Sequence, residues 1–328
     1  MTDKKLKKLL QILGDGEYHS GNDLGEKLGV TRAAVWKLIQ QIKELGINIE
    51  AKTNLGYCIP GGMELLSTTQ IKKNLSPQYQ SLIKNLDILN IVDSTNNYLL
   101  NKARSGTSDI AICLAENMTA GRGRFGRQWV SCFGKNIYLS LLWHFKTDIS
   151  KLLGLSNVVA VAVARALQKY GVSEHLGLKW PNDIQWQGHK LAGILIELHG
   201  ESHHHSHAVI GIGLNLDLIS QLSTKSKIDL IDLLTITGKK PQRNQLSAYI
   251  IEAVIDALKK FQLEGLQPFI TEWIKLDVAL NQPVKIIAGQ KEIKGIYRGI
   301  DSATGELVLE EKGGNLQRYS SGEVSLRF

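Results

Sequence analysis

The sequence predicts an α+β chain of three domains: a winged helix-turn-helix over residues 1–62, a mixed-sheet domain over 67–277 and a small β-barrel over 281–328. Three observations predict this division. With 328 residues, the chain is too long for one core. Helical patterns open it, strand-like and helical runs alternate in its middle, and short strand-like runs close it. The sequence PGG at Pro60–Gly62 is a turn-rich boundary after the first block.

Composition restricts the partners and the compartment. The formal net charge of +8 favours an anionic partner, such as nucleic acid, a phosphate compound or a membrane surface. Three widely spaced cysteines fit a reducing compartment, because they form neither a disulfide framework nor a zinc motif. The lysine-rich start lacks the cleavage site of a signal peptide, and no uninterrupted apolar run approaches the ~18 residues of a membrane span. We therefore expect a cytoplasmic protein that does not cross a membrane.

The first block has the pattern of a helix-turn-helix followed by a wing. Two helical segments meet at Gly29, with Ser20 or Asn22 as the cap of the first and Thr31 as the cap of the second. Gly25 lies where two crossing helices need a small residue. Two short strands around the sequence KTNLG then form the wing. The residues expected to contact DNA are Thr31, Arg32, Trp36, Lys37, Gln40 and Lys52.

The same block also fits a small helical module that binds another protein. Its nine Lys and Arg against seven Asp and Glu leave little net positive charge. This weakens the case for DNA, since non-specific DNA affinity comes largely from the neutralisation of phosphates. We nevertheless favour DNA binding, because helix, turn, helix and wing follow one another in order.

The second block alternates apolar strands with amphipathic helices, and the third has strands only. Strand-like runs cover residues 110–116, 136–145, 191–199 and 208–216, and helical runs cover 154–171 and 244–265. Residues 283–328 contain short strand-like runs separated by turn sequences such as DSATGE and KGGN. The pattern of this last block is typical of a small barrel.

The sequence AGRGRFGRQW, from Ala120 to Trp129, has an unusual composition. Its glycines make the backbone mobile, and its three arginines suit fork-like contacts with carboxylate or phosphate. Such a loop is too mobile to be structural by itself and too regularly cationic to be an ordinary linker. We therefore interpret this segment, which we call the Arg–Gly loop, as a clamp for an anionic ligand.

Three further motifs lie where strand-like runs end, which is where α/β sheets place ligand sites. They are DSTNNYL at 93–99, KWPND at 179–183 with Lys190 after it, and GIGLN at 211–215. Each also has a purely structural interpretation. Ser94–Asn96 could cap a helix that begins at Tyr98, and WPND could be a turn. Lys190 could be a surface lysine, and GIGLN could be a tightly packed strand edge.

Together, the motifs indicate a site for a carboxylic acid and a nucleotide phosphate. Lys190 stands at the start of an almost wholly apolar strand, so its ammonium would lie over a pocket floor. Asp183 could hold Mg²⁺, which usually takes one or two protein carboxylates beside phosphate oxygens. No Ser-His-Asp or Cys-His arrangement is recognisable, so we expect the chemistry to rest on positioning and electrostatics.

The motifs GRGRFGRQW, KWPND followed by KLAGIL, and DSTN resemble the signatures of biotin–protein ligases. With the winged helix in front and the small β domain behind, nearly all 328 residues resemble the bacterial biotin ligases that also repress the biotin operon. The resemblance implies a central domain of the class II synthetase-like type and an SH3-like C-terminal barrel. It implies an enzyme that uses ATP and Mg²⁺ to form biotinyl-5′-AMP from biotin. The biotinyl group then passes to a lysine of the biotin carboxyl carrier protein of acetyl-CoA carboxylase.

The resemblance also implies a regulatory role. The adenylate-bound protein would form a homodimer and bind the operator DNA of biotin synthesis genes. Homodimer and carrier would compete for one sheet edge, which the sequence does not identify. The Arg–Gly loop would fold over the adenylate and keep water from the reactive anhydride.

The resemblance assigns roles to individual residues and leaves no residue as the ligand of a resident metal. The catalytic set is Lys190, Arg122, Arg124 and Asp183. The biotin-binding set is Ser94, Thr95, Asn96, Met118, Arg122, Gly123, Arg124 and Lys190. The nucleotide-binding set is Trp129, Asn182, Gly213 and Asn215.

Three features of the chain stand apart from this assignment. Met118 occupies a position where the family usually has glutamine, and a thioether cannot replace the donor and acceptor of an amide. Ile231 lies in a segment where some relatives place an aromatic ring over adenine, so we expect weaker stacking. The run His203–His207 suggests a metal site, but consecutive histidines point in divergent directions, so we expect none.

Two other functions fit part of the pattern. A lipoate–protein ligase shares the catalytic fold and also adenylates a carboxylic acid, but the full Arg–Gly loop and the winged helix argue against it. A repressor that only senses a ligand would have no need of Lys190 and of a loop that protects an anhydride. The bifunctional ligase is therefore the favoured hypothesis.

Overall fold

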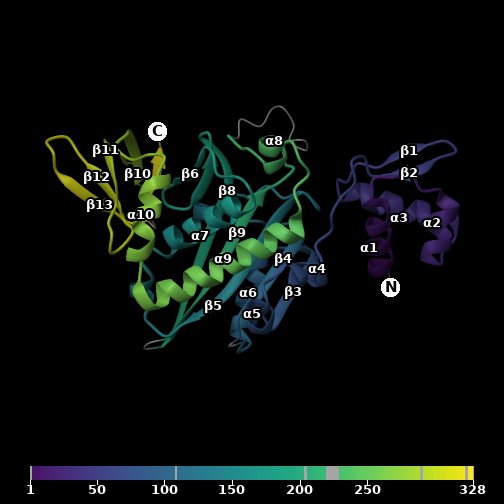
Figure 1. Ribbon diagram of the computed structural model, residues 1–328, viewed down its shortest axis with the longest axis horizontal. Coiled ribbons are helices and arrows are strands. Elements are labelled where there is room, and N and C mark those ends of the chain that lie inside the picture. Colours follow the sequence, from purple (N-terminus) through teal and green to yellow (C-terminus); the bar gives the residue numbers. More distant parts are fainter. Residues whose placement is uncertain are drawn as a thin grey trace.

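The computed structural model describes residues 2–107, 109–202, 205–218, 229–288, 291–321 and 324–327. Figure 1 shows a small helical part at one end, a central sheet covered by helices, and a second sheet at the other end, which contains the C-terminus. The predicted α+β architecture, with a helix-turn-helix, a mixed sheet and a small β part in this order, is confirmed.

The N-terminal part is a three-helix domain with a β-hairpin. Its elements are α1 (Thr2–Leu13), α2 (Gly21–Leu28), α3 (Arg32–Glu44), β1 (Glu50–Lys52) and β2 (Gly56–Cys58). Ser20 caps α2 and Thr31 caps α3, each by accepting a backbone N–H with its side-chain oxygen. A Cβ atom at Gly25 would come 2.7 Å from the carbonyl oxygen of Val30. The close crossing of the two helices therefore requires glycine at this position, as predicted.

The central sheet has seven strands in the order β3-β4-β5-β9-β8-β7-β6. They are β3 (Asn85–Val92), β4 (Ala111–Met118), β5 (Asn136–Phe145), β6 (Leu176–Lys179), β7 (Asp183–Trp186), β8 (His189–Ser202) and β9 (His205–Asn215). The pair β3 and β4 is parallel, and the other neighbours are antiparallel. Because β8 is long and β7 short, β7 pairs with β8 only as far as Gly193.

Helices cover both faces of this sheet. They are α4 (Thr68–Asn74), α5 (Pro77–Leu82), α6 (Thr95–Arg104), α7 (Leu155–Lys169), α8 (Leu233–Thr237), α9 (Arg243–Glu264) and α10 (Gln267–Leu276). The helices α7 and α9 share the large apolar core with one face of the sheet, and α6 packs on the other face against β4, β5 and β9. Among the described residues, Ile149–Lys169 is long and apolar enough to cross a membrane, and 61% of its most apolar window is buried inside the protein. That burial is typical of a core helix.

The C-terminal part is an antiparallel sheet in the order β13-β12-β11-β10-β14. Its strands are β10 (Pro283–Ala288), β11 (Lys291–Ile300), β12 (Leu307–Glu310), β13 (Leu316–Tyr319) and β14 (Val324–Arg327). It is fixed to the central part by polar contacts: Trp180 Nε1 donates to the carbonyl oxygen of Gly305 at 3.0 Å. Asp277 accepts from the Tyr297 hydroxyl at 2.8 Å, and burial raises the pKa of this carboxyl group.

Candidate functional site

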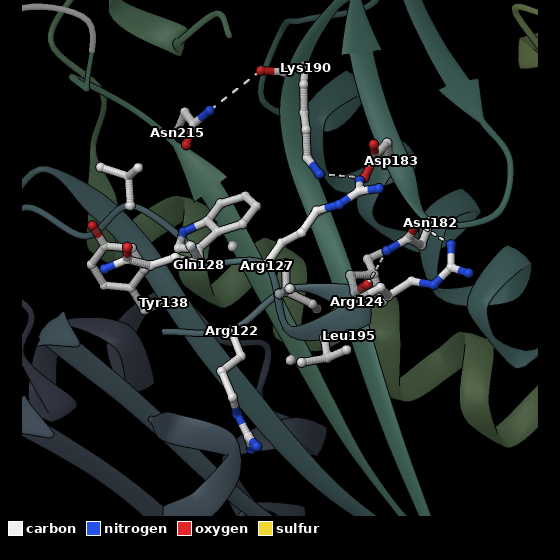
Figure 2. A pocket seen from close by; sticks show the side chains of 18 of the residues that line it. Arg122, Arg124, Arg127, Gln128, Tyr138, Asn182, Asp183, Lys190, Leu195 and Asn215 are labelled. Atoms are coloured by element: carbon white, nitrogen blue, oxygen red, sulfur yellow. Dashed lines mark hydrogen bonds and ion pairs between the residues drawn. The ribbon is translucent and has the colours of Figure 1, made fainter. Parts of the chain in front are cut away.

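A cavity of about 290 Å³ lies between the Arg–Gly loop, the start of α6, the turn after β6, and the strands β8 and β9. Figure 2 shows a close view of it. Every residue that the resemblance assigned to catalysis, to biotin or to the nucleotide lines this one cavity. Segments more than one hundred residues apart in sequence thus meet here, since Ser94 and Leu326 both line it. The C-terminal part therefore also contributes to its wall.

Lys190 projects into the cavity from β8. Its Nζ lies 2.6 Å from Asp183 Oδ1 and 5.4 Å from the centroid of the Trp129 ring, and 29% of its side chain is exposed (Figure 2). The backbone is fixed as well, because Lys190 N donates to Asp229 O and Lys190 O accepts from Ile231 N, each at 3.0 Å. The interpretation of Lys190 as a surface lysine is wrong, since the ion pair and the ring contact hold its ammonium inside the site.

Trp129 lies against a pair of glycines that face each other on neighbouring strands. Gly193 on β8 pairs with Gly213 on β9. A Cβ atom would come 2.9 Å from the indole at Gly193 and 2.5 Å from it at Gly213. Only glycine at these two positions leaves room for the ring, so GIGLN is a close-packed strand that also forms part of the cavity wall.

Three buried polar atoms of the cavity have no hydrogen-bond partner within the described part of the chain: Trp129 Nε1, Asp183 Oδ1 and Asn215 Oδ1. Asp183 Oδ1 forms the ion pair with Lys190, so the donor Trp129 Nε1 and the acceptor Asn215 Oδ1 are the two left without any polar contact. The amide nitrogen of Asn215 donates to Ile231 O at 3.2 Å, so its oxygen is the atom left for a ligand. Buried polar groups are nearly always satisfied, so we infer that a bound molecule supplies both partners. Ile231 itself is 8% exposed and packs in the core.

The arginines of the loop point in different directions. Arg122 donates to Asn97 Oδ1 at 2.6 Å and pairs with Glu197 at 3.3 Å, on the side of the cavity away from Lys190 (Figure 2). Arg124 donates to Asn182 Oδ1 at 3.4 Å and to the carbonyl oxygen of Ser321 in the C-terminal part. Burial lowers the pKa of the Arg124 guanidinium. The structure thus brings Arg124 close to Asn182 and leaves Arg122 at the rim.

The start of α6 forms another part of the cavity wall. Ser94 occupies the N-cap position of the helix, but the helix begins at Thr95 instead of Tyr98 and the Ser94 side chain makes no capping hydrogen bond. Thr95 and Asn96 are each 4% exposed. Thr95 Oγ1 lies 3.8 Å from Met118 Sδ, which is a weak contact between a hydroxyl and a thioether.

Two residues that contact the lining side chains of Thr95 and Asn96 were missed in the sequence. Ser140, which is fully buried in β5, lies 2.7 Å from Thr95 Oγ1 and 2.6 Å from Asn96 Oδ1. Glu197 in β8 accepts from Asn96 Nδ2 at 2.7 Å. A signal for both was present, since each is a polar side chain inside an almost wholly apolar strand and therefore needs a buried partner. The motif WPND is both a turn and part of the site, because Trp180–Asn182 form a turn whose residues line the cavity.

The predicted DNA-contacting residues occupy α3 and the hairpin. Arg32, Trp36 and Lys37 are exposed on α3, with Trp36 54% exposed, and Gln40 is partly buried. Thr31 is the cap of this helix. Lys52 is exposed in the hairpin, where its Nζ lies 4.8 Å from the Tyr18 ring centroid and 3.7 Å from Glu50.

Metal ligands are sparse in this site. The run His203–His207 lies partly outside the described residues, since 203 and 204 are not among them. Within the described ranges, no group of three His, Cys, Asp or Glu side chains could hold a metal ion. A Mg²⁺ ion that arrives with a nucleotide has a smaller requirement, because phosphate oxygens and water supply most of its ligands. Asp183, beside Lys190, offers the one carboxylate that this mode of binding needs.

Comparisons with known proteins agree with this geometry. Residues 88–215 match the Biotin/lipoate A/B protein ligase family, residues 5–58 an HTH domain, and residues 279–327 the Biotin protein ligase C terminal domain. The chain is 40% identical to the bifunctional ligase/repressor BirA of Salmonella typhimurium, with 97% of this chain and 96% of that protein covered. The chain belongs to the bifunctional ligase/repressor family of biotin protein ligases.

Further members of the ligase/repressor family and solved ligases agree. The corresponding protein of Escherichia coli is also 40% identical, over 98% of this chain and 96% of that one. The biotin protein ligase from Aquifex aeolicus, solved in complex with biotin and ATP, aligns with a TM-score of 0.64 and 31% identity. It covers 74% of this chain and 99% of its own length, so this structural match extends over about three quarters of the ligase/repressor described here.

Proposed function

We propose that this ligase/repressor activates biotin with ATP in the described cavity and passes it to a lysine of the biotin carboxyl carrier protein of acetyl-CoA carboxylase, in the cytoplasm. The observation that carries the proposal is that one cavity brings Lys190 together with two kinds of polar group. The first kind is the buried hydroxyl and amide groups of Thr95 and Asn96. The second kind is the two atoms without a hydrogen-bond partner in Trp129 and Asn215.

Each part of the two substrates has a chemical counterpart in this cavity. The ureido ring of biotin, with two N–H groups and a carbonyl, suits the polar end at Ser94–Asn96. The carboxylate and the α-phosphate would meet at Lys190, with Arg124 next to them. The adenine amino group would donate to Asn215 Oδ1. Mg²⁺, held by Asp183, would neutralise charge on the departing pyrophosphate.

The reaction then requires positioning more than acid–base chemistry. A carboxylate oxygen of biotin forms a bond to the α-phosphorus, and the bond from that phosphorus to the bridging oxygen of pyrophosphate breaks. In the second step, the amine of the carrier lysine attacks the acyl carbon, AMP leaves, and the amine loses a proton. Lys190 would leave Asp183 to neutralise negative charge that builds up at the α-phosphate, which is electrostatic stabilisation of the transition state. The Arg–Gly loop would keep water from the anhydride between the two steps.

The first half-reaction gives a direct test. We expect the protein to exchange labelled pyrophosphate into ATP when biotin is present and not when lipoate replaces it. Lipoate is the matched control, because it is also a carboxylic acid with a sulfur ring and an aliphatic tail but has no ureido group. Exchange with lipoate only would replace biotin as the substrate, and exchange with neither acid from folded protein would refute the adenylation step.

The regulatory half of the proposal rests on contacts between the segment after the Arg–Gly loop and the winged helix. Phe133, four residues after Trp129, is 4% exposed in the core of the N-terminal domain together with Met63. The connecting segment is fixed by Arg243, which donates to Glu64 O at 2.7 Å and to Glu116 at 2.6 Å. A change of the loop on ligand binding would therefore reach the core of the winged helix through packed residues.

We propose the second half of β8 as the edge that a second copy or the carrier pairs with, since β7 leaves it uncovered beyond Gly193. Glu197 in this stretch contacts Asn96 and Arg122, so the edge lies next to the cavity. We expect sedimentation to show a dimer only with biotinyl-5′-AMP, and operator DNA binding that weakens with salt. Equal dimerisation with and without the adenylate would contradict this regulation.

A further inference from the structure

Glu197 connects the two parts of the site that must act together. It lies opposite Val209 in the second half of β8, and 25% of its side chain is exposed. One carboxylate oxygen, Oε2, accepts from Asn96 Nδ2 at 2.7 Å. The other, Oε1, faces Arg122 Nη2 at 3.3 Å. A single anion thus contacts both the buried end of the cavity and the Arg–Gly loop.

The contact with Asn96 fixes the orientation of an amide. An ionised carboxylate can only accept hydrogen bonds, so Asn96 must turn its nitrogen toward Glu197 and its oxygen the other way. Asn96 Oδ1 then lies 2.6 Å from Ser140 Oγ. A second contact supports this orientation, because Asn96 Nδ2 also faces the carbonyl oxygen of Leu195 at 3.4 Å.

The orientation of Asn96 determines the direction of the next two hydrogen bonds. Ser140 has one hydroxyl proton and lies within 2.7 Å of two acceptors, Asn96 Oδ1 and Thr95 Oγ1. Since Asn96 Oδ1 can only accept, the proton of Ser140 goes to it, and the short contact with Thr95 must be donated by Thr95. The competing approach of Thr95 to Met118 Sδ is 3.8 Å long and weak. Thr95 Oγ1 therefore faces the cavity with its lone pairs.

We propose that Glu197 is a positioning residue that orders this chain of hydrogen bonds, so that Thr95 offers an acceptor to a ligand N–H. The proposal deepens the proposed function and rests on it, because the ureido ring of biotin has two N–H donors. The same carboxylate holds Arg122 at the rim of the cavity. Recognition of the ring and placement of the loop thus depend on one side chain that does not touch the ligand itself.

Glu197→Gln tests the direction of these hydrogen bonds with little change in the shape of the side chain. A carboxamide can donate to Asn96 Oδ1, which would turn Asn96 around, reverse both hydroxyl bonds and point the Thr95 proton at the ligand N–H. We expect the KM for biotin in pyrophosphate exchange to rise about tenfold, the effect of roughly one mismatched hydrogen bond. The KM for ATP and kcat at saturating biotin should stay within about twofold, because Lys190 and Asn215 are untouched and the carboxamide oxygen can still accept from Arg122.

Ser140→Ala separates this role from a general loss of structure. It removes the hydroxyl that links Asn96 to Thr95 by hydrogen bonds, so the direction of the Thr95 hydroxyl no longer depends on Glu197. In the Ser140→Ala background we expect Glu197→Gln to add less than about twofold to the KM for biotin, which is a strongly non-additive double-mutant cycle. Glu292→Gln, a glutamate of β11 that faces Lys285 in the C-terminal sheet, is the matched control and should leave the KM unchanged.

Three outcomes would overturn the proposal. The first is an unchanged KM for biotin in Glu197→Gln, and the second is an effect that simply multiplies with that of Ser140→Ala. The third is a general fall of kcat with a lower melting temperature, which would assign Glu197 a purely structural role. These results are interpretable only if the unaltered protein exchanges pyrophosphate with biotin, so a failure of the proposed function is seen separately, in the unaltered protein.

Discussion

Lys190→Ala should lower kcat/KM for biotin-dependent pyrophosphate exchange by about 10²–10³-fold, which is the cost of removing one charged group that stabilises a developing negative charge. The structure places the ammonium 2.6 Å from Asp183, which is an ion pair that a phosphate can replace. Without Lys190, the carboxylate of biotin and the α-phosphate would repel each other across the cavity. The loss should therefore appear in kcat as well as in KM. Initial rates of exchange at several concentrations of biotin and ATP measure both.

Lys190→Met is the control for packing. Methionine keeps an unbranched chain against Trp129 but carries no charge, and the backbone bonds of residue 190 to Asp229 and Ile231 do not depend on the side chain. We expect Met and Ala to be about equally inactive in exchange. A methionine variant close to the unaltered protein would assign Lys190 a packing role and contradict its electrostatic one.

Much of the fold could be predicted from local patterns in the sequence. The strand predicted at 136–145 coincides with β5, and the helix predicted at 244–265 differs from α9 by one residue at each end. Both are long and rich in apolar residues, and Gly265 marks the end of the helix. The short strands β6 and β7 were not predicted, because four residues carry little periodicity. Their pairing depends on the tertiary arrangement of the turn between them.

The site was predicted as a set of motifs, and the structure adds how they interact. Lys190 and Arg124 could be named because charged and Gly-rich stretches stand out from an apolar background, and Asn182 was named because its motif resembles that of biotin–protein ligases. The ion pair between Lys190 and Asp183 was not predictable, because it depends on the register between β7 and β8, including an irregularity after Ile184. The direction of Arg122, toward Asn97 and away from Lys190, also depends on the conformation of a Gly-rich loop.

Gly213→Val should abolish most of the activity through the position of a single ring. A side chain at residue 213 would place its Cβ 2.5 Å from the indole of Trp129, so the ring must move away from its position against Gly193 and Gly213. The Trp129 ring is also the surface under the Lys190 ammonium, at 5.4 Å from its centroid. A displacement of about 1 Å at a reacting group can cost on the order of 10²-fold. We expect a loss of this size in kcat/KM for ATP, measured by the same exchange reaction.

The cause of that loss can be isolated in a second background. Trp129→Ala removes the ring that valine would displace, so Gly213→Val should cost little more in Trp129→Ala than Trp129→Ala costs alone. If the two losses instead multiply, valine acts through the strand itself, for example by disturbing the neighbouring Asn215. The outcome thus decides whether the paired glycines serve the ring or the sheet. Glycine in a strand interior normally weakens the strand. A role in accommodating the ring explains why two paired positions on adjacent strands are both glycine.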